Sequence, residues 1–244
     1  MTNDDQNHGS EKGYGQFHRR VLEARGGLFA IATTIAILIG GIVEIVPMYT
    51  AGAGPETADW VTPYTPLEVA GRDIYIREGC YLCHSQWVRP MRAEVVRYGE
   101  WSRAPEYQFD RPFLLGSRRM GPDLHRVGQK YPDAWHFEHM RDPRSTSPGS
   151  VMPPYPWLLT STVDSEDIHA SVRALKKSGV PYSDTDVDGV AASLAAQGQE
   201  IVTSLAGANL QTSADTEIVA MIAYLQRLGR EGKAYLSNQQ GGGG

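Results

Sequence analysis

The chain has 244 residues, of which 41% are hydrophobic and 21% charged, an ordinary composition for one sizeable folded domain with accessory segments. A formal net charge of −5 at pH 7 gives no indication of nucleic-acid binding. Because Cys80 and Cys83 are the only cysteines, the sequence excludes a disulfide framework and a zinc site built from cysteines alone.

The first predicted element is a membrane span. The apolar stretch Gly26 to Tyr49 would form a helix of roughly 36 Å at about 1.5 Å per residue, long enough to cross a bilayer. Basic residues precede it, and none follows before Arg72. The positive-inside rule therefore predicts a cytoplasmic tail over residues 1–25, a single transmembrane helix over 26–49 and the remainder of the chain outside. A signal peptide cleaved near residues 51–53 is the alternative, which the long preceding segments disfavour.

Residues 50–64 are rich in Gly, Pro and Thr and lack periodicity, which predicts a linker. Trp60 and Tyr64 in this segment are expected to anchor at the membrane interface. The folded domain is predicted over residues 65–230, and residues 231–244 are expected to form a flexible tail.

The domain is predicted to begin with a helix from Pro66 to about Gly79, because Thr65 can cap it and Glu68 can complete a capping box. Gly71 lies on one face of this helix, four residues from Tyr75. We expect the last helix, near residues 216–228, to cross there.

Further helices are predicted over residues 165–175 and 184–205 from their apolar periodicity. Residues 85–160 carry many Pro, Gly, Arg and aromatic residues without a sustained period, so they are expected to be mostly loop. The fold class is therefore mainly α. A loop of this length inside a domain needs something to wrap around.

Cys80, Cys83 and His84 have the spacing of a c-type haem attachment motif, CYLCH. Cys80 and Cys83 would form thioethers with the haem vinyl groups, and His84 would be the proximal iron ligand. A thioredoxin-like thiol oxidoreductase is the rival interpretation, but it needs the motif after a strand in an α/β pattern. Here the motif follows a capped helix. A plain disulfide or a pair of buried thiols is the remaining alternative.

The second iron ligand is expected to be Met152, because Pro153 and Pro154 stiffen the loop that carries it. Met120 is the main competitor, and Met140 is a weaker one. Four histidines leave bis-histidine ligation open, although each is more often a surface or satisfied residue: His125, His136, His139 and His169.

Eight arginines lie between His84 and Val127 in a chain that is net negative. Arginine forks suit haem propionates and carboxylates of a partner, although at least half of these residues are expected to form a solvated face. They are Arg89, Arg92, Arg97, Arg103, Arg111, Arg118, Arg119 and Arg126.

Five segments closely resemble subunit II of the cbb-type haem-copper cytochrome c oxidases: residues 80–84 (CYLCH), 118–124 (RRMGPDL), 150–158 (SVMPPYPWL), 179–182 (GVPY) and 223–226 (AYLQ). The resemblance covers nearly the whole chain. It implies a class I-like cytochrome c domain with long loops on the periplasmic side of the inner membrane. One transmembrane helix would anchor this domain in the membrane lipid. It also implies a single haem c with His84 and Met152 as iron ligands.

As function, the resemblance implies a non-catalytic electron-transfer subunit. It would receive electrons from a di-haem cytochrome c subunit and pass them to the haem b and copper of a catalytic subunit that reduces O₂ to water. The family also suggests that Ser102 lies near a calcium ion at the subunit boundary. A free-standing, membrane-tethered electron carrier is the alternative function, but the long loops favour a fixed interface.

Overall fold

The computed structural model describes residues 18–50 and 57–241. They fall into two compact units, one within Met1–Pro55 and one within Glu56–Gly244. Parts of three predicted segments lie outside the described residues: residues 1–17 of the cytoplasmic tail, 51–56 of the linker and 242–244 of the C-terminal tail.

The first unit contains a π-helical turn, His18–Glu23, followed by α1 (Gly26–Thr50). Within the described part of the chain, α1 is the one helix long and apolar enough to cross a membrane. Its apolar side chains face outward, and Ile37 and Val43 are 69% and 68% exposed. Such a surface is stable in lipid rather than in water, so the prediction of one N-terminal candidate transmembrane helix is confirmed.

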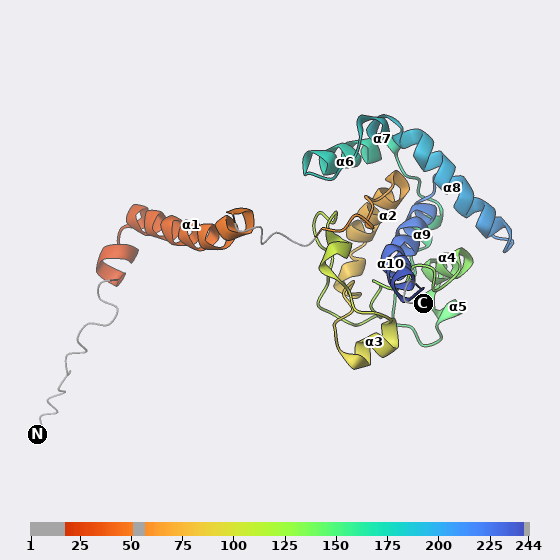
Figure 1. The fold of residues 1–244 in the computed structure, drawn as a ribbon, viewed down its shortest axis with the longest axis horizontal. Helices are drawn as coiled ribbons and strands as arrows, with labels where there is room; N and C mark the ends of the chain where they lie inside the picture. The colour runs from red at the N-terminus through yellow and green to blue at the C-terminus, as the bar shows by residue number, and fades with distance from the viewer. Residues whose placement is uncertain (1–17, 51–56, 242–244) are drawn as a thin grey trace, which may run out of the picture. The chain divides into compact units, whose positions relative to one another are not determined.

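The second unit is helical, and its described residues contain no strand beyond an isolated bridge between Thr162 and Thr216. The prediction of a mainly α fold is therefore confirmed. Its elements in chain order (Figure 1) are α2 (Pro66–Arg77), η2 (Cys80–Leu82), α3 (Arg92–Tyr98), η3 (Ala104–Tyr107), α4 (Asp133–Arg141), α5 (Pro143–Thr146), η4 (Pro156–Leu159), α6 (Ser165–Lys177), α7 (Asp184–Asp188), α8 (Val190–Ala206), α9 (Glu217–Arg227) and α10 (Arg230–Gly241).

Helix α2 starts and packs as the sequence indicates. Thr65 and Glu68 form the predicted capping box at its N-terminus. The helix crosses α9 at Gly71, where a Cβ atom would lie only 2.0 Å from the backbone oxygen of Ala220. The ring of Tyr75 packs beside this contact, with its centroid 5.3 Å from that of Tyr224. The absence of a side chain at Gly71 therefore allows the two helices to approach closely.

Substituting Gly71→Ala should lower the free energy of unfolding by about 1–3 kcal/mol, because the new methyl group forces α2 away from α9. Thermal unfolding of the full chain in mild detergent, followed by circular dichroism, measures this loss. Gly207→Ala serves as the matched control, since Gly207 already has helical dihedral angles. Equal midpoints for the two variants would contradict the close crossing.

The predicted helix over residues 184–205 is divided in two. A capping box between Ser183 and Asp186 starts α7, which ends before Gly189, and α8 continues from Val190. Gly189 has φ −86° and ψ 4°, away from the usual helical values, and glycine is a poor helix former, so the predicted helix is divided at this residue.

Residues 85–160 are mostly loop, as predicted, but they also contain α4, which the sequence reading missed. Pro132 precedes this helix and Asp133 opens its first turn. Both features suit a helix N-terminus, yet the many aromatic and histidine residues that follow obscured its apolar period.

Residues 57–64 of the predicted linker (50–64) and residues 231–241 of the predicted flexible tail (231–244) make ordered contacts with the domain. The ring of Trp60 stacks on that of Tyr235 with centroids 4.6 Å apart, and the Tyr64 hydroxyl donates a hydrogen bond to Asp110. Residues 230–241 form α10, and the Glu231 carboxylate accepts a hydrogen bond from the backbone of Thr62. Both segments therefore pack within the domain, and the rings of Trp60 and Tyr64 with them.

Candidate functional site

A cavity of about 510 Å³ with a mainly apolar wall lies beside η2. Cys80, Cys83 and His84 line it, and Met152 lines it from a distant part of the sequence. The sequence predicts five site residues: Cys80, Cys83, His84, Met152 and Ser102. The structure brings the first four together at this cavity. The volume is that of a site for a sizeable organic group.

The two cysteines and the histidine are presented on one tight turn. Helix α2 is followed by Gly79, whose positive φ of 69° lets the chain reverse into η2. The backbone N–H groups of Cys83 and His84 both donate to the Cys80 carbonyl, at 3.2 and 3.0 Å. Both thiols are free and half-buried. The turn therefore directs three reactive side chains to the same cavity.

The Cys80 thiol is strongly affected by its surroundings. Burial, assisted by the nearby Glu78 carboxylate, raises the pKa of Cys80 to about 12. The sulfur is consequently held as a neutral thiol at neutral pH.

The imidazole of His84 is held by one hydrogen bond and by the close approach of Gly121 to its ring. Its Nδ1 lies 2.8 Å from the Pro122 carbonyl oxygen, which can only accept, so Nδ1 carries the proton. A Cβ at Gly121 would lie 2.2 Å from Cε1 of the ring, so glycine is needed beside it. Burial lowers the pKa of His84. The neutral ring therefore keeps the lone pair of Nε2 available as a ligand.

Met152 is half-buried on a loop that is tied down at both sides. Its backbone N–H donates to Ser150 Oγ at 3.2 Å, and the Tyr155 N–H donates to the Met140 carbonyl at 2.8 Å. Pro153 and Pro154 lie between these two hydrogen bonds and restrict the backbone further.

Met120 lines the same cavity in a different setting. Its side chain is 65% exposed, and its sulfur lies 4.0 Å from that of Cys83. Met140 and Met221 also line the cavity, but they are 7% and 1% exposed and belong to the hydrophobic core. Met91 is 46% exposed and is not among the lining residues.

Helix α4 and the turn before it contribute a stack of three rings to the cavity wall, which was not predicted from the sequence. Tyr131, Trp135 and His139 stack successively, with centroid distances of 4.0 and 4.5 Å. Their spacing of four residues places them on one side of a helix and was the signal available in the sequence. His139 Nδ1 lies 2.6 Å from Thr146 Oγ1. His136, three residues before His139, is 1% exposed and also lines the cavity.

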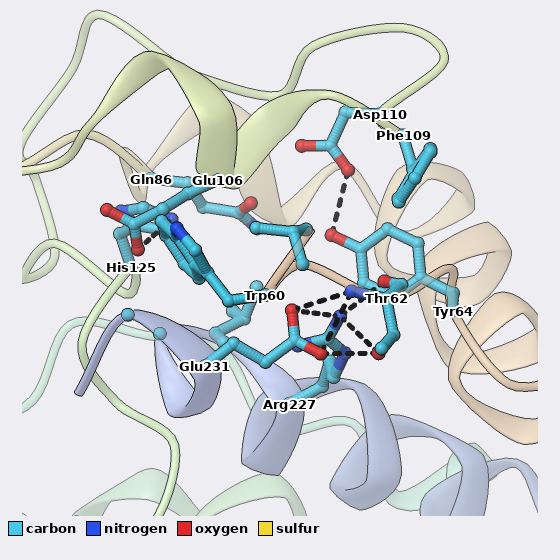
Figure 2. Close-up of a pocket in the computed structure, with 14 residues that line it drawn as sticks. Trp60, Thr62, Tyr64, Gln86, Glu106, Phe109, Asp110, His125, Arg227 and Glu231 are labelled. Carbon is cyan, nitrogen blue, oxygen red and sulfur yellow. Dashed lines mark hydrogen bonds and ion pairs between the residues drawn. The ribbon is translucent and has the colours of Figure 1, made fainter. Parts of the chain in front are cut away.

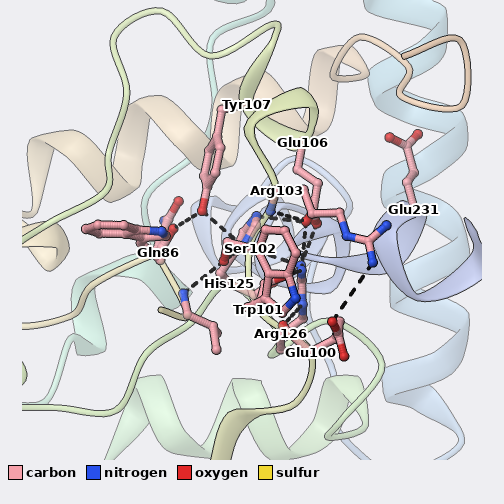
Figure 3. A network of polar contacts seen from close by, with 12 residues as sticks. Gln86, Glu100, Trp101, Ser102, Arg103, Glu106, Tyr107, His125, Arg126 and Glu231 are labelled. Atoms are coloured by element: carbon pink, nitrogen blue, oxygen red, sulfur yellow. Dashed lines mark hydrogen bonds and ion pairs between the residues drawn. The ribbon is translucent and has the colours of Figure 1, made fainter. Parts of the chain in front are cut away.

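Ser102, the fifth predicted residue, lies away from this cavity in a buried polar network (Figure 3). Its hydroxyl accepts a hydrogen bond from the Val88 N–H at 2.8 Å and contacts His125 Nδ1. The ring of Tyr107 stacks on His125, with centroids 4.6 Å apart. Burial, and next the charge of Arg126, lowers the pKa of His125 well below its usual value, so the imidazole is neutral.

The Ser102 hydroxyl is thus occupied by partners within the chain. Within residues 18–50 and 57–241, no group of three or more His, Cys, Asp or Glu side chains could hold a metal ion. The calcium contact of Ser102 stays a prediction.

A second, much smaller cavity of about 30 Å³ has room for roughly one water molecule (Figure 2). Arg227 donates to the Thr62 carbonyl at 2.7 Å and pairs with Glu231 at 2.8 Å on its wall. These contacts hold the segment around Thr62, where the chain enters the domain, against α9 and α10. Their role is structural.

Most of the eight arginines bond within the domain or face solvent. Arg126, which pairs with Glu106 at 2.5 Å, is the one of the eight that lines the large cavity. Arg119 bridges Glu94 and Asp123 at 2.8 and 3.6 Å. Arg92, Arg97 and Arg118 are exposed.

Comparison with known protein families matches residues 19–231 to the family described as cytochrome c oxidase, mono-heme subunit/FixO. The match covers well over half of the chain and includes the apolar helix, both cysteines and Met152. A search among curated proteins finds no match.

Proposed function

Because the chain belongs to the FixO family of mono-haem cytochrome c oxidase subunits, we propose that it passes single electrons through a covalently bound haem c to a catalytic haem b and copper subunit. The donor in this proposal is a di-haem cytochrome c subunit, and the catalytic subunit reduces O₂ to water. The observation that carries the proposal is the single cavity lined by Cys80, Cys83, His84 and Met152. The chain itself transfers electrons and does no bond chemistry on a substrate.

The residues around the cavity fit a haem. Its apolar wall suits a planar macrocycle, and two thiols stand on a turn beside a histidine whose Nε2 is free of the Pro122 contact. When bound, the haem supplies a one-electron iron couple. Each thiol, Cys80 and Cys83, would add its S–H across one vinyl group, a step that consumes no oxidant or reductant. His84 would offer Nε2 to the iron, oriented by its bond to Pro122.

Met152 is proposed as the residue that would hold the iron together with His84, in preference to Met120. The iron–thioether bond is weak, so the position of the sulfur must be held by the protein. The loop of Met152 is held by the hydrogen bonds of Ser150 and Tyr155 and by two prolines. Met120 is 65% exposed, so water could compete with its sulfur.

For topology, we propose that α1 anchors the chain in the inner membrane with its N-terminus in the cytoplasm and the haem domain in the periplasm. Arg19, Arg20 and Arg25 precede the apolar segment, and the next basic residue in the sequence is Arg72, which supports this orientation. The haem domain in this proposal comprises the predicted range 65–230, extended by residues 57–64 and by α10.

Purification of the full chain in mild detergent, through a tag placed after Gly244, tests the proposed assembly. The chain is expected to elute with a protein that carries haem b and copper and with a di-haem cytochrome, identified by spectra and mass spectrometry. An unrelated tagged single-span protein from the same membranes is the control. A haem-loaded chain that elutes alone would instead favour a free-standing, membrane-tethered electron carrier.

A further inference from the structure

His136 on α4 carries a buried nitrogen that the protein does not satisfy. The residue is 1% exposed, and its Nε2 makes no hydrogen bond within the described part of the chain. A buried polar atom without a partner is energetically unfavourable, so such atoms usually have a role. Because His136 also lines the large cavity, the missing partner is expected to be the group that fills it.

The ring of His136 is suited to donate rather than to carry charge. Burial lowers its pKa to about 4, with His139 acting in the same direction and Asp133 opposing it. The Asp133 carboxylate is itself occupied, since Gln226 Nε2 donates to it at 2.7 Å. A neutral imidazole has one N–H to donate, and a bound acceptor would complete it.

The surroundings of His136 favour an anionic acceptor. His136 lies in the N-terminal half of α4, and the N-terminus of a helix attracts negative charge. Lys130, just before this helix, also lines the cavity and adds a positive charge to its wall. The groups of a haem that accept strong hydrogen bonds are its two propionate carboxylates.

We propose that His136 is a positioning residue that donates a hydrogen bond from Nε2 to a propionate carboxylate of the haem. This inference rests on the haem attachment proposed above. The bond orients the macrocycle and partly offsets the negative charge of the carboxylate. Without it, the carboxylate would favour the oxidised iron more strongly, and the midpoint potential would fall.

The test compares His136→Leu, which removes the donor, with His136→Gln, which retains an N–H. The full chain is purified with its haem in mild detergent. The midpoint potential and the propionate bending band in the resonance Raman spectrum are then measured. His136→Leu should lower the potential and shift the band, whereas His136→Gln should lie close to the unaltered protein. His169→Leu is the matched control, because His169 on α6 is not among the cavity-lining residues.

Two results would overturn the inference while leaving covalent haem and the proposed function intact. One is a His136→Leu variant with unchanged potential and unchanged propionate band. The other is loss of six-coordinate iron in that variant, which would make His136 an iron ligand. If His136→Leu retains no haem, His136→Asn is measured in its place, because the shorter side chain moves the N–H donor away from the propionate. Equal midpoint potentials for His136→Asn and His136→Gln would then refute the proposal. An unaltered protein without covalent haem would refute the proposed function itself.

Discussion

Replacing Cys80 and Cys83 together with alanine is expected to abolish haem staining of the chain after denaturing electrophoresis. Denaturation strips any group held only by packing or by axial ligands, so the stain reports covalent attachment alone. The two sulfurs are the only thiols in the chain, and the turn of η2 directs both to the cavity. The expected effect is therefore complete loss.

The matched control for this variant is Met152→Leu, which alters the methionine proposed as an iron ligand and leaves both thiols in place. It should keep its full haem stain. Haem that remained covalently bound in the double cysteine variant would show that the attachment assigned to η2 is wrong, whatever family the chain belongs to.

Substituting Met152→His is expected to lower the midpoint potential by on the order of 0.1 V, a fraction of the roughly 0.8 V range that axial ligands cover. A thioether favours reduced iron relative to imidazole, and it gives the oxidised protein a weak sulfur-to-iron charge-transfer band. That band should disappear in Met152→His. Redox titration and the near-infrared spectrum measure the two effects.

Met120→Leu is the control, because Met120 lines the same cavity yet is largely exposed. It should change neither the potential nor the band. The ligand assignment would move to Met120 if Met120→Leu erased the band while Met152→Leu kept it. The proline-stiffened loop would then serve another purpose.

The helices that could be predicted are those whose local and tertiary signals agree. Thr65 and Glu68 cap α2 through residues three positions apart, and Gly71 marks the crossing with α9 within the same short segment. Helix α10 could not be predicted in this way. Its sequence, REGKAYLSNQQG, has little apolar period, and it is held by contacts such as that of Tyr235 with Trp60, which is remote in sequence.

The site follows the same division. Cys80, Cys83 and His84 could be predicted as an attachment motif because they lie within five positions, and Met152 could be predicted as a ligand because two prolines follow it. The roles of Gly121 beside His84 and of His136 in the cavity depend on segments that meet only after folding. No local pattern distinguishes them from an ordinary turn glycine or a surface histidine.

Burial of Cys80 should slow the oxidation of its thiol in a chain that has folded without haem. At a pKa of about 12, only about one molecule in 10⁵ carries the Cys80 thiolate at pH 7, and the thiolate is the form that reacts with oxidants and disulfides. A chain that folds before haem arrives would therefore oxidise slowly at this sulfur, even in an oxidising compartment. Burial of Cys80 would thus protect the unloaded chain against premature closure of a Cys80–Cys83 disulfide.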